Sequence, residues 1–111
     1  MKTINAYELK EQIDSGKTLV VEGLPEKYYR DGHIPSALNL PFDSLEGLAA
    51  KVLPDCSAPI VVYCGSSTCK TLPLAVERLD ALGYQNVIVY LGGKSDWKKI
   101  GFPLVKGENP I

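Results

Sequence analysis

Long apolar runs and an excess of charge of one sign are both missing from this sequence of 111 residues. No hydrophobic stretch approaches the ~20 residues that a transmembrane helix requires, so we do not expect a membrane protein. The 12 basic and 13 acidic residues are interspersed and give a net charge of −1. This balance argues against nucleic acid or an anionic membrane as the main partner, because both need a patch of one sign. The opening residues, MKTINAYELKEQID, lack the apolar block of a signal peptide, so we expect a cytoplasmic protein.

Cysteine and histidine are also scarce. The chain has three cysteines, Cys56, Cys64 and Cys69, and one histidine, His33. An odd and small number of cysteines does not suit a disulfide framework. Four residues separate Cys64 from Cys69 and no second pair matches them, which does not suit a structural zinc site. We therefore expect neither a metal nor another cofactor.

No repeat, low-complexity tract or linker divides the chain, and its length fits one domain over residues 1–111. Asn5 and Glu8 form a capping-box pattern that predicts a helix over residues 6–15. Asp43 and Ser95 are predicted to cap two further helices, and residues 70–82 carry an apolar stripe that ends at Gly83. Short helical turns are expected within residues 25–31.

Apolar, β-branched runs predict strands at residues 18–22, 37–40, 59–63 and 87–90. The run at 59–63 does not alternate with polar residues, which is typical of a strand covered on both faces. Strands that alternate with helices indicate an α/β fold, with a mostly parallel central sheet flanked by helices on both faces.

A thiol follows the strand at 59–63 directly. In parallel α/β sheets the reactive crevice lies beyond the carboxyl ends of the strands, and Cys64 is placed there. A tight loop of small and polar residues can turn its N–H groups inward as an anion nest, which stabilises the nucleophilic thiolate. The loop residues that we expect to bind substrate are Gly65, Ser66, Ser67, Thr68, Cys69 and Lys70. The alternative is that Cys64 is a buried, inert cysteine.

The stretch VVYCGSSTCKTLPLAVERLDALGYQNVIVYLGGKSDWKKIGFPL resembles the active-site half of a rhodanese-like sulfurtransferase domain. Upstream, DGHIPSALNLP is similar to that family's Gly-His-Ile-Pro-Gly-Ala motif, with Ser36 in place of glycine. The resemblance implies that the Cys64 thiolate accepts sulfur from thiosulfate, a persulfide or a polysulfide. It would pass that sulfur to a small thiol, to cyanide, or to a protein acceptor such as thioredoxin.

The sequence departs from the family pattern at two places. Cys69 stands at the sixth loop position, where the family often has arginine, and Lys70 is the only cation nearby. The family's Asp-Val-Arg after the second strand is replaced by Glu22-Gly-Leu24. Both departures weaken recognition of a doubly charged donor, so we expect thiosulfate to be a poor substrate.

Cys69 has two interpretations. It is either a resolving thiol, which attacks a Cys64 persulfide and leaves a Cys64–Cys69 disulfide, or a small residue that fills a helix start. Cys56 is expected to be a bystander. Two other function classes stay open, a non-catalytic binding module and a phosphatase or arsenate reductase. The second is disfavoured because a phosphatase loop of this kind needs arginine where Lys70 stands.

Three other residues are weighed against plainer interpretations. His33 is conceivable as a base for Cys64, but a structural hydrogen bond is favoured. Trp97 is expected to pack in the core or at a rim. Lys94 belongs either to a solvated face or, through the turn at residues 92–93, to the rim of the pocket.

Overall fold

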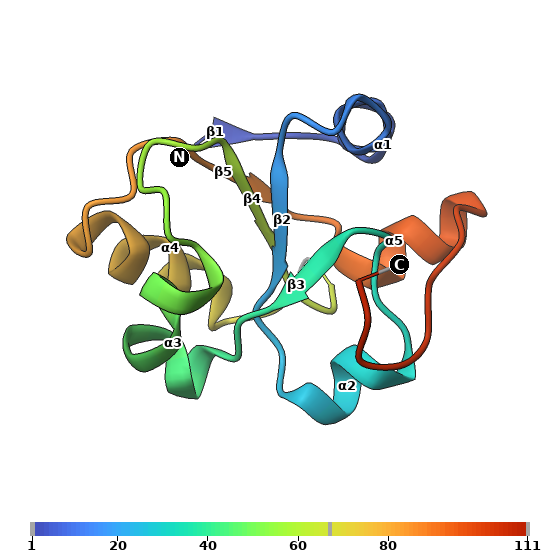
Figure 1. The fold of residues 1–111 in the computed structure, drawn as a ribbon. Helices are drawn as coiled ribbons and strands as arrows, with labels where there is room; N and C mark the ends of the chain where they lie inside the picture. Colours follow the sequence, from blue (N-terminus) through green and yellow to red (C-terminus); the bar gives the residue numbers. More distant parts are fainter. Residues whose placement is uncertain (1, 67, 111) are drawn as a thin grey trace.

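The computed structural model describes residues 2–66 and 68–110, and its centre is a five-stranded sheet with the order β1-β5-β4-β2-β3 (Figure 1). Every pairing in the sheet is parallel. The strands are β1 (Lys2–Thr3), β2 (Leu19–Glu22), β3 (Ala37–Asn39), β4 (Ile60–Tyr63) and β5 (Val87–Tyr90). Strand β4 occupies the middle position and is buried along its whole length. The predicted α/β fold with a parallel sheet is confirmed.

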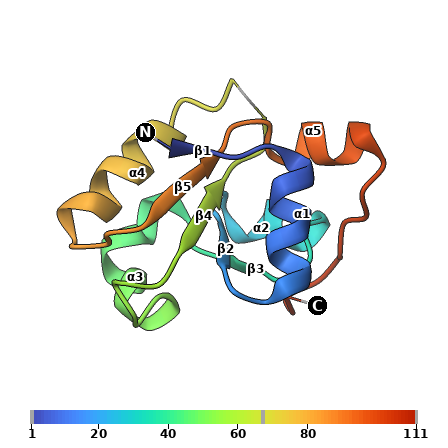
Figure 2. The ribbon, with the colours of Figure 1, turned by 90° about the horizontal axis from the view of Figure 1, so that it is seen from above.

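Helices cover both faces of the sheet, as Figure 2 shows from above. They are α1 (Ala6–Ser15), α2 (Glu26–Asp31), α3 (Leu45–Val52), α4 (Leu72–Ala81) and α5 (Gly93–Ile100), with a 3-10 turn at Phe42–Ser44. The buried apolar residues form two clusters. One contains side chains of α3 and α4, and the other contains side chains of α1, α2 and α5. Residues of β4 contribute alternately to the two clusters, because successive side chains of a strand point to opposite faces.

The capping box at the start of α1 is present as predicted, and Gly16 ends this helix in the left-handed conformation. Two other predicted caps are wrong. Asp43 lies inside the 3-10 turn, and α3 begins only after Ser44. Ser95 lies within α5, whose N-cap is Gly92, and its amide donates to the carbonyl of Gly65 at 2.9 Å. The α5 helix therefore starts earlier than expected. It contacts the loop that joins β4 to α4 and carries Cys64 and Cys69, which we call the cysteine loop.

Two other boundaries differ from the prediction. The edge strand β1 was not predicted, because two exposed residues leave no apolar pattern. Helix α4 begins at Leu72, so Cys69 and Lys70 belong to the loop and do not form a helix start. Within the described part of the chain, no helix is long and apolar enough to cross a membrane.

Candidate active site

Cys64 is the first residue after the central strand β4, at the carboxyl edge of the sheet. Its neighbours in register at this edge are Glu22 at the end of β2 and Tyr90 at the end of β5, both paired with Tyr63. The side chain of Cys64 is only 2% exposed. The strand therefore delivers the thiol to the edge where parallel α/β sheets hold their reactive groups, but covers it from solvent.

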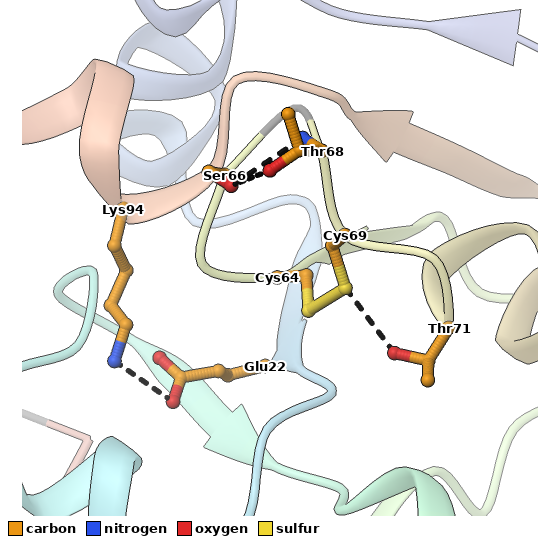
Figure 3. Close-up of a disulfide and its surroundings, with 7 residues drawn as sticks. All are labelled: Glu22, Cys64, Ser66, Thr68, Cys69, Thr71 and Lys94. Carbon is orange, nitrogen blue, oxygen red and sulfur yellow. Dashed lines mark hydrogen bonds and ion pairs between the residues drawn. A yellow bond between two sulfur atoms is a disulfide. The ribbon is translucent and has the colours of Figure 1, made fainter.

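Cys64 and Cys69 form a disulfide across the loop that joins β4 to α4 (Figure 3). Their Cα atoms are 6.4 Å apart, within the range that a disulfide requires. Cys69 is half-buried, and its sulfur lies 3.2 Å from the hydroxyl of Thr71. The loop thus brings together the two thiols that the sequence analysis singled out. Thr71 was not predicted as a site residue, since a threonine before a helix is usually read as a cap.

Hydrogen bonds within the loop hold its curved shape. The amide of Cys69 donates to the carbonyl of Ser66 at 3.2 Å, and the hydroxyls of Ser66 and Thr68 are 2.9 Å apart. The amide of Thr68 faces the Ser66 hydroxyl at 3.4 Å. Two of the amides expected to form an anion nest are therefore bonded inside the loop in this disulfide state. Ser67, also expected to bind substrate, lies outside the described residues.

The start of α5 packs directly on the cysteine loop. The amide of Lys94 donates to the carbonyl of Cys64 at 3.1 Å. Gly93 has a φ of +65°, and a Cβ atom there would lie 2.5 Å from the same carbonyl oxygen. Only glycine fits this conformation and this close approach without strain. The turn at residues 92–93 therefore holds the backbone of Cys64 in place at the point where the chain leaves β4.

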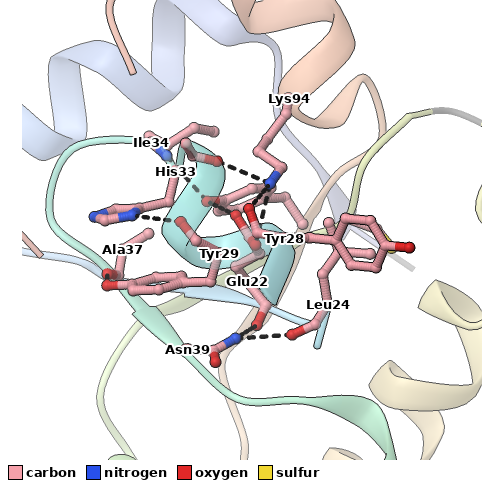
Figure 4. A network of polar contacts seen from close by, with 12 residues as sticks. Glu22, Leu24, Tyr28, Tyr29, His33, Ile34, Ala37, Asn39 and Lys94 are labelled. Atoms are coloured by element: carbon pink, nitrogen blue, oxygen red, sulfur yellow. Dashed lines mark hydrogen bonds and ion pairs between the residues drawn. The ribbon is translucent and has the colours of Figure 1, made fainter. Parts of the chain in front are cut away.

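A buried carboxylate, Glu22, lies beside this edge and is fully covered from solvent (Figure 4). The hydroxyl of Tyr63 donates to Glu22 Oε1 at 2.7 Å, and Lys94 Nζ lies 3.3 Å from Glu22 Oε2. Burial raises the pKa of Glu22 above its ordinary value of 4.5, while the Tyr63 hydrogen bond and the Lys94 charge lower it. The charge of Lys94 and two directed contacts compensate the cost of burying this carboxylate.

Lys94 and Tyr63 also bind the backbone of α2 and of the segment that joins α2 to β3. Lys94 Nζ donates to the carbonyls of Tyr28 and Gly32, each at 2.8 Å. The Tyr63 hydroxyl accepts from the amide of Ile34 at 3.0 Å. Burial, followed by the charge of Glu22, raises the pKa of Tyr63 well above its usual range. The sequence left two interpretations of Lys94 open, a solvated face or the rim of the pocket. The structure supports the second.

The other candidate residues have plainer surroundings. His33 is fully buried, its Nδ1 lies 3.0 Å from the carbonyl of Tyr29, and its ring stacks on the ring of that tyrosine. This agrees with the favoured structural role. Trp97 is buried in the core, as expected. Cys56 is an exposed free thiol, and Lys70 is exposed at the end of the loop. Residues 2–66 and 68–110 contain no group of three His, Cys, Asp or Glu side chains placed to hold a metal.

Two hollows flank the disulfide loop. One, of about 390 Å³, adjoins Thr71 and lies over the ends of β2 and β3. The other, of about 250 Å³, adjoins Gly65 and lies over α5. The first is lined by Gly23, Leu24, Pro25, Pro41, Phe42, Asp43, Ser44 and Thr71. The second is lined by Asp31, Gly32, Gly65, Lys94, Ser95, Lys98 and Leu104.

Comparison with known proteins agrees with this arrangement. The family model for the rhodanese-like domain matches residues 5–100. The chain belongs to the rhodanese-like domain family. It is 31% identical over 104 residues to the HTH-type transcriptional regulator Rv0324 of Mycobacterium tuberculosis. That match covers 94% of the chain and 45% of the regulator, so the chain spans less than half the length of this relative.

Solved structures share this fold. The crystal structure of the Alr3790 protein from Anabaena sp. is 28% identical, with a TM-score of 0.82, and the match covers 93% of this chain and 80% of that one. The human single-domain sulfurtransferase TSTD1 is 23% identical, with a TM-score of 0.77 and coverage of 89% and 96%. The second likeness concerns the fold alone.

Proposed function

We propose that this rhodanese-like domain transfers sulfane sulfur through Cys64 and that Cys69 is the resolving thiol. The observation that carries the proposal is the Cys64–Cys69 disulfide at the carboxyl edge of β4. A second thiol within reach of Cys64 can attack its persulfide and release the outer sulfur as hydrosulfide. Cys69 is that thiol, because its sulfur already bonds to Cys64.

The reaction has three steps. The Cys64 thiolate attacks the outer sulfur of a persulfide donor, the donor's S–S bond breaks, and the donor leaves as a thiolate while Cys64 becomes a persulfide. The Cys69 thiolate then attacks the inner sulfur, Sγ of Cys64. Hydrosulfide leaves with the bonding electron pair, and the Cys64–Cys69 disulfide forms. Two equivalents of thiol, from small molecules or from a dithiol protein such as thioredoxin, then reduce the disulfide and are themselves oxidised.

An acceptor thiol competes with Cys69 in the second step. If it attacks the outer sulfur first, that sulfur is transferred and Cys64 returns as a thiolate without any disulfide. In the proposal, N–H groups of the loop, residues 65–70, hold the outer sulfur and its negative charge during transfer.

Persulfides and polysulfides are the donors that this loop suits best. Thiosulfate carries two negative charges, and recognition of such an anion usually employs arginine, which binds in a planar, bidentate way. Cys69 occupies the position where the rhodanese-like family often has arginine. Lys70 is an exposed point charge beside it. Thiosulfate is therefore expected to react slowly in comparison with a persulfide.

Intact-protein mass spectrometry tests the proposal. The reduced protein is incubated with thiosulfate, glutathione persulfide, polysulfide, a phosphate ester or buffer, and is then weighed. In protein that carries Cys69→Ser, so that no disulfide can form, the expected result is a gain of one sulfur atom. That gain should disappear when Cys64→Ser is added and persist when Cys56→Ser is added. Unchanged sulfur transfer by Cys64→Ser would show that another group carries the chemistry.

A second function is favoured by one observation. The matched region forms 45% of a protein named as a transcriptional regulator. A rhodanese-like unit in such a setting would use the dithiol–disulfide change as a signal and would not need repeated turnover. Counting sulfide released per protein molecule separates the two functions. Many equivalents in the presence of a reductant indicate a sulfurtransferase, whereas about one equivalent indicates a sensor.

A further inference from the structure

The two sulfurs of the disulfide differ in their access to solvent. Cys64 is 2% exposed, and the start of α5 covers its backbone through the bond from the Lys94 amide to its carbonyl. Cys69 is half-buried and contacts Thr71, which is itself exposed. Thiol–disulfide exchange requires the attacking thiolate to reach one sulfur, so access selects which sulfur is attacked. This asymmetry favours Cys69.

The hollow of about 390 Å³ lies on the Cys69 side of the loop, because Thr71 belongs to its wall. Leu24, which also lines this hollow, lies near the loop, with its Cδ1 atom 3.8 Å from a Cβ position built at Gly65. Leu24, Phe42 and Cys69 all pack against the core cluster that contains Cys64. The hollow is therefore separated from the accessible sulfur by Thr71, which lines the hollow and whose hydroxyl lies 3.2 Å from Cys69 Sγ.

The lining of this hollow indicates the kind of molecule that fits it. Its side chains are mostly apolar, from Leu24, Pro25, Pro41 and Phe42, and Asp43 is the one ionisable residue among the described residues that line it. Its volume falls in the range of small-molecule sites, roughly 300–1,000 Å³. A carboxylate at an apolar site disfavours an anionic ligand and tolerates a neutral or cationic one.

We propose that the Cys64–Cys69 disulfide is reduced by a small organic thiol that binds in this hollow through an uncharged carbon skeleton and attacks Sγ of Cys69. The thiolate sulfur bonds to Cys69, the Cys64–Cys69 bond breaks, and Cys64 leaves with the electron pair as a thiolate. A second thiolate then attacks the sulfur of the bound molecule, which releases an external disulfide and the Cys69 thiolate. This inference rests on the proposed function in one respect: sulfur transfer would be the reaction that forms the disulfide.

The attacked sulfur is identified by trapping. The full chain is oxidised with diamide, which forms the disulfide without any sulfur donor, and is then treated with benzyl mercaptan and excess iodoacetamide. Tandem mass spectrometry, with fragment ions from cleavage between residues 65 and 68, locates the two labels. We expect the benzyl adduct on Cys69 and the carbamidomethyl group on Cys64. The reverse pattern would overturn the proposal.

Rates of reduction test the choice of thiol. Benzyl mercaptan, 2-mercaptoethanol, cysteamine and 2-mercaptoethanesulfonate are compared, with each rate divided by the fraction of thiolate present. Burial of an aromatic ring should make benzyl mercaptan about 10-fold faster than 2-mercaptoethanol. Charge repulsion should make the sulfonate about 5-fold slower than 2-mercaptoethanol. If all four thiols react at equal rates after correction for the thiolate fraction, the hollow is not a binding site. The thiols would then react by simple collision with an exposed sulfur.

Two variants link these rates to the hollow. Asp43→Asn should remove most of the penalty on the sulfonate, whereas Asp31→Asn, in the hollow on the other side of the loop, should leave it unchanged. Leu24→Ala should slow benzyl mercaptan about 5-fold and leave 2-mercaptoethanol unchanged. A protein dithiol that reduces the disulfide far faster than every small thiol, with no effect of Leu24→Ala, would show that the hollow is not the entry site. Because the disulfide is made with diamide, these outcomes are independent of whether sulfur transfer occurs.

Discussion

The backbone amide of Lys94 donates to the carbonyl of Cys64 at 3.1 Å, while the ammonium group of the same lysine pairs with the buried Glu22 at 3.3 Å. One residue of α5 thus connects the candidate nucleophile to a charged network on β2. The side chains of Lys94 and Glu22 are 15% and 0% exposed. Solvent therefore screens this ion pair much less than a surface pair.

Lys94→Met should leave the Glu22 carboxylate buried without its cation. Removal of one partner of a buried ion pair is strongly destabilising, and since Lys94 keeps some exposure we expect a loss of about 2–4 kcal/mol in the free energy of unfolding at neutral pH. Urea denaturation measures it. Lys98→Met, an exposed lysine on the same helix, is the matched control and should change the free energy by less than about 0.5 kcal/mol.

The deficit of Lys94→Met should also depend on pH. Burial raises the pKa of Glu22 above 4.5, so its folded form retains a proton that the unfolded chain has lost. The contribution of protonated Glu22 to the free energy of unfolding is therefore fully present below pH 4.5. It is lost as the pH rises through the pKa that Glu22 has in the folded protein. Without Lys94 the pKa of Glu22 rises further, so the gap between variant and wild type should be smallest near pH 4.5 and should widen as the pH rises through the folded pKa of Glu22 in the variant. A gap that is constant over this range would mean that Glu22 is not the group left unpaired.

Tyr63→Phe should destabilise the fold through two lost hydrogen bonds. The hydroxyl donates to Glu22 at 2.7 Å and accepts from the amide of Ile34 at 3.0 Å, and the partners would stay buried. Leaving buried polar groups without partners costs about 1–3 kcal/mol each, so we expect a loss of about 2–4 kcal/mol in the free energy of unfolding. Tyr28→Phe, at a half-exposed tyrosine, is the control and should be nearly neutral. Equal stability of the two variants would contradict the network.

Gly93→Ala should disturb the cysteine loop as well as the stability. The new methyl group would lie 2.5 Å from the carbonyl oxygen of Cys64, and the positive φ adds strain. Together these should cost about 3 kcal/mol. Gly101→Ala is the matched control, because Gly101 has a φ of +100° but nothing within 4 Å of its added Cβ, so only about 1 kcal/mol of strain is expected there. Denaturation and the rate of disulfide formation should both respond at Gly93, whereas only denaturation should respond at Gly101.

Thr71→Val should slow the resolving step. The hydroxyl of Thr71 lies 3.2 Å from Cys69 Sγ and can donate to the thiolate before it attacks. Loss of one such bond is worth about 1 kcal/mol, which corresponds to about 5-fold in rate. The measurement is the rate of sulfide release after a single dose of persulfide. Thr68→Val, in the same loop, removes a hydroxyl that pairs with Ser66, and it should have the smaller effect.

The sequence predicted the parallel sheet because its strands are unbroken apolar runs that a sheet covered on both faces requires. The sequence also placed Cys64 at the sheet edge, because Cys64 directly follows one of these apolar runs. Helix caps were less predictable. Asn5 acts through a local pattern and was found, whereas Ser95 bonds to a distant loop and has no local pattern to reveal it.

The charged network could not be predicted. Glu22 appeared only as a departure from a family motif, and nothing near it in the sequence names Lys94 or Tyr63 as its partners. The pairing depends on three segments that meet at the sheet edge, so it follows from topology and not from local pattern. A single acidic residue at the end of a buried strand was the available signal, since a buried carboxylate needs compensation.

The most direct test of the central claim is the mass of the protein after one exposure to glutathione persulfide, in wild type and in Cys69→Ser. If Cys69 resolves the Cys64 persulfide, the wild type should end as the Cys64–Cys69 disulfide with about one equivalent of sulfide released. Cys69→Ser should instead retain one extra sulfur atom on Cys64 and release little sulfide, because an intramolecular thiolate has a large advantage over a free one. Cys56→Ser should behave as the wild type. Free loop thiols in the wild type, with equal sulfide release by Cys69→Ser, would contradict the account.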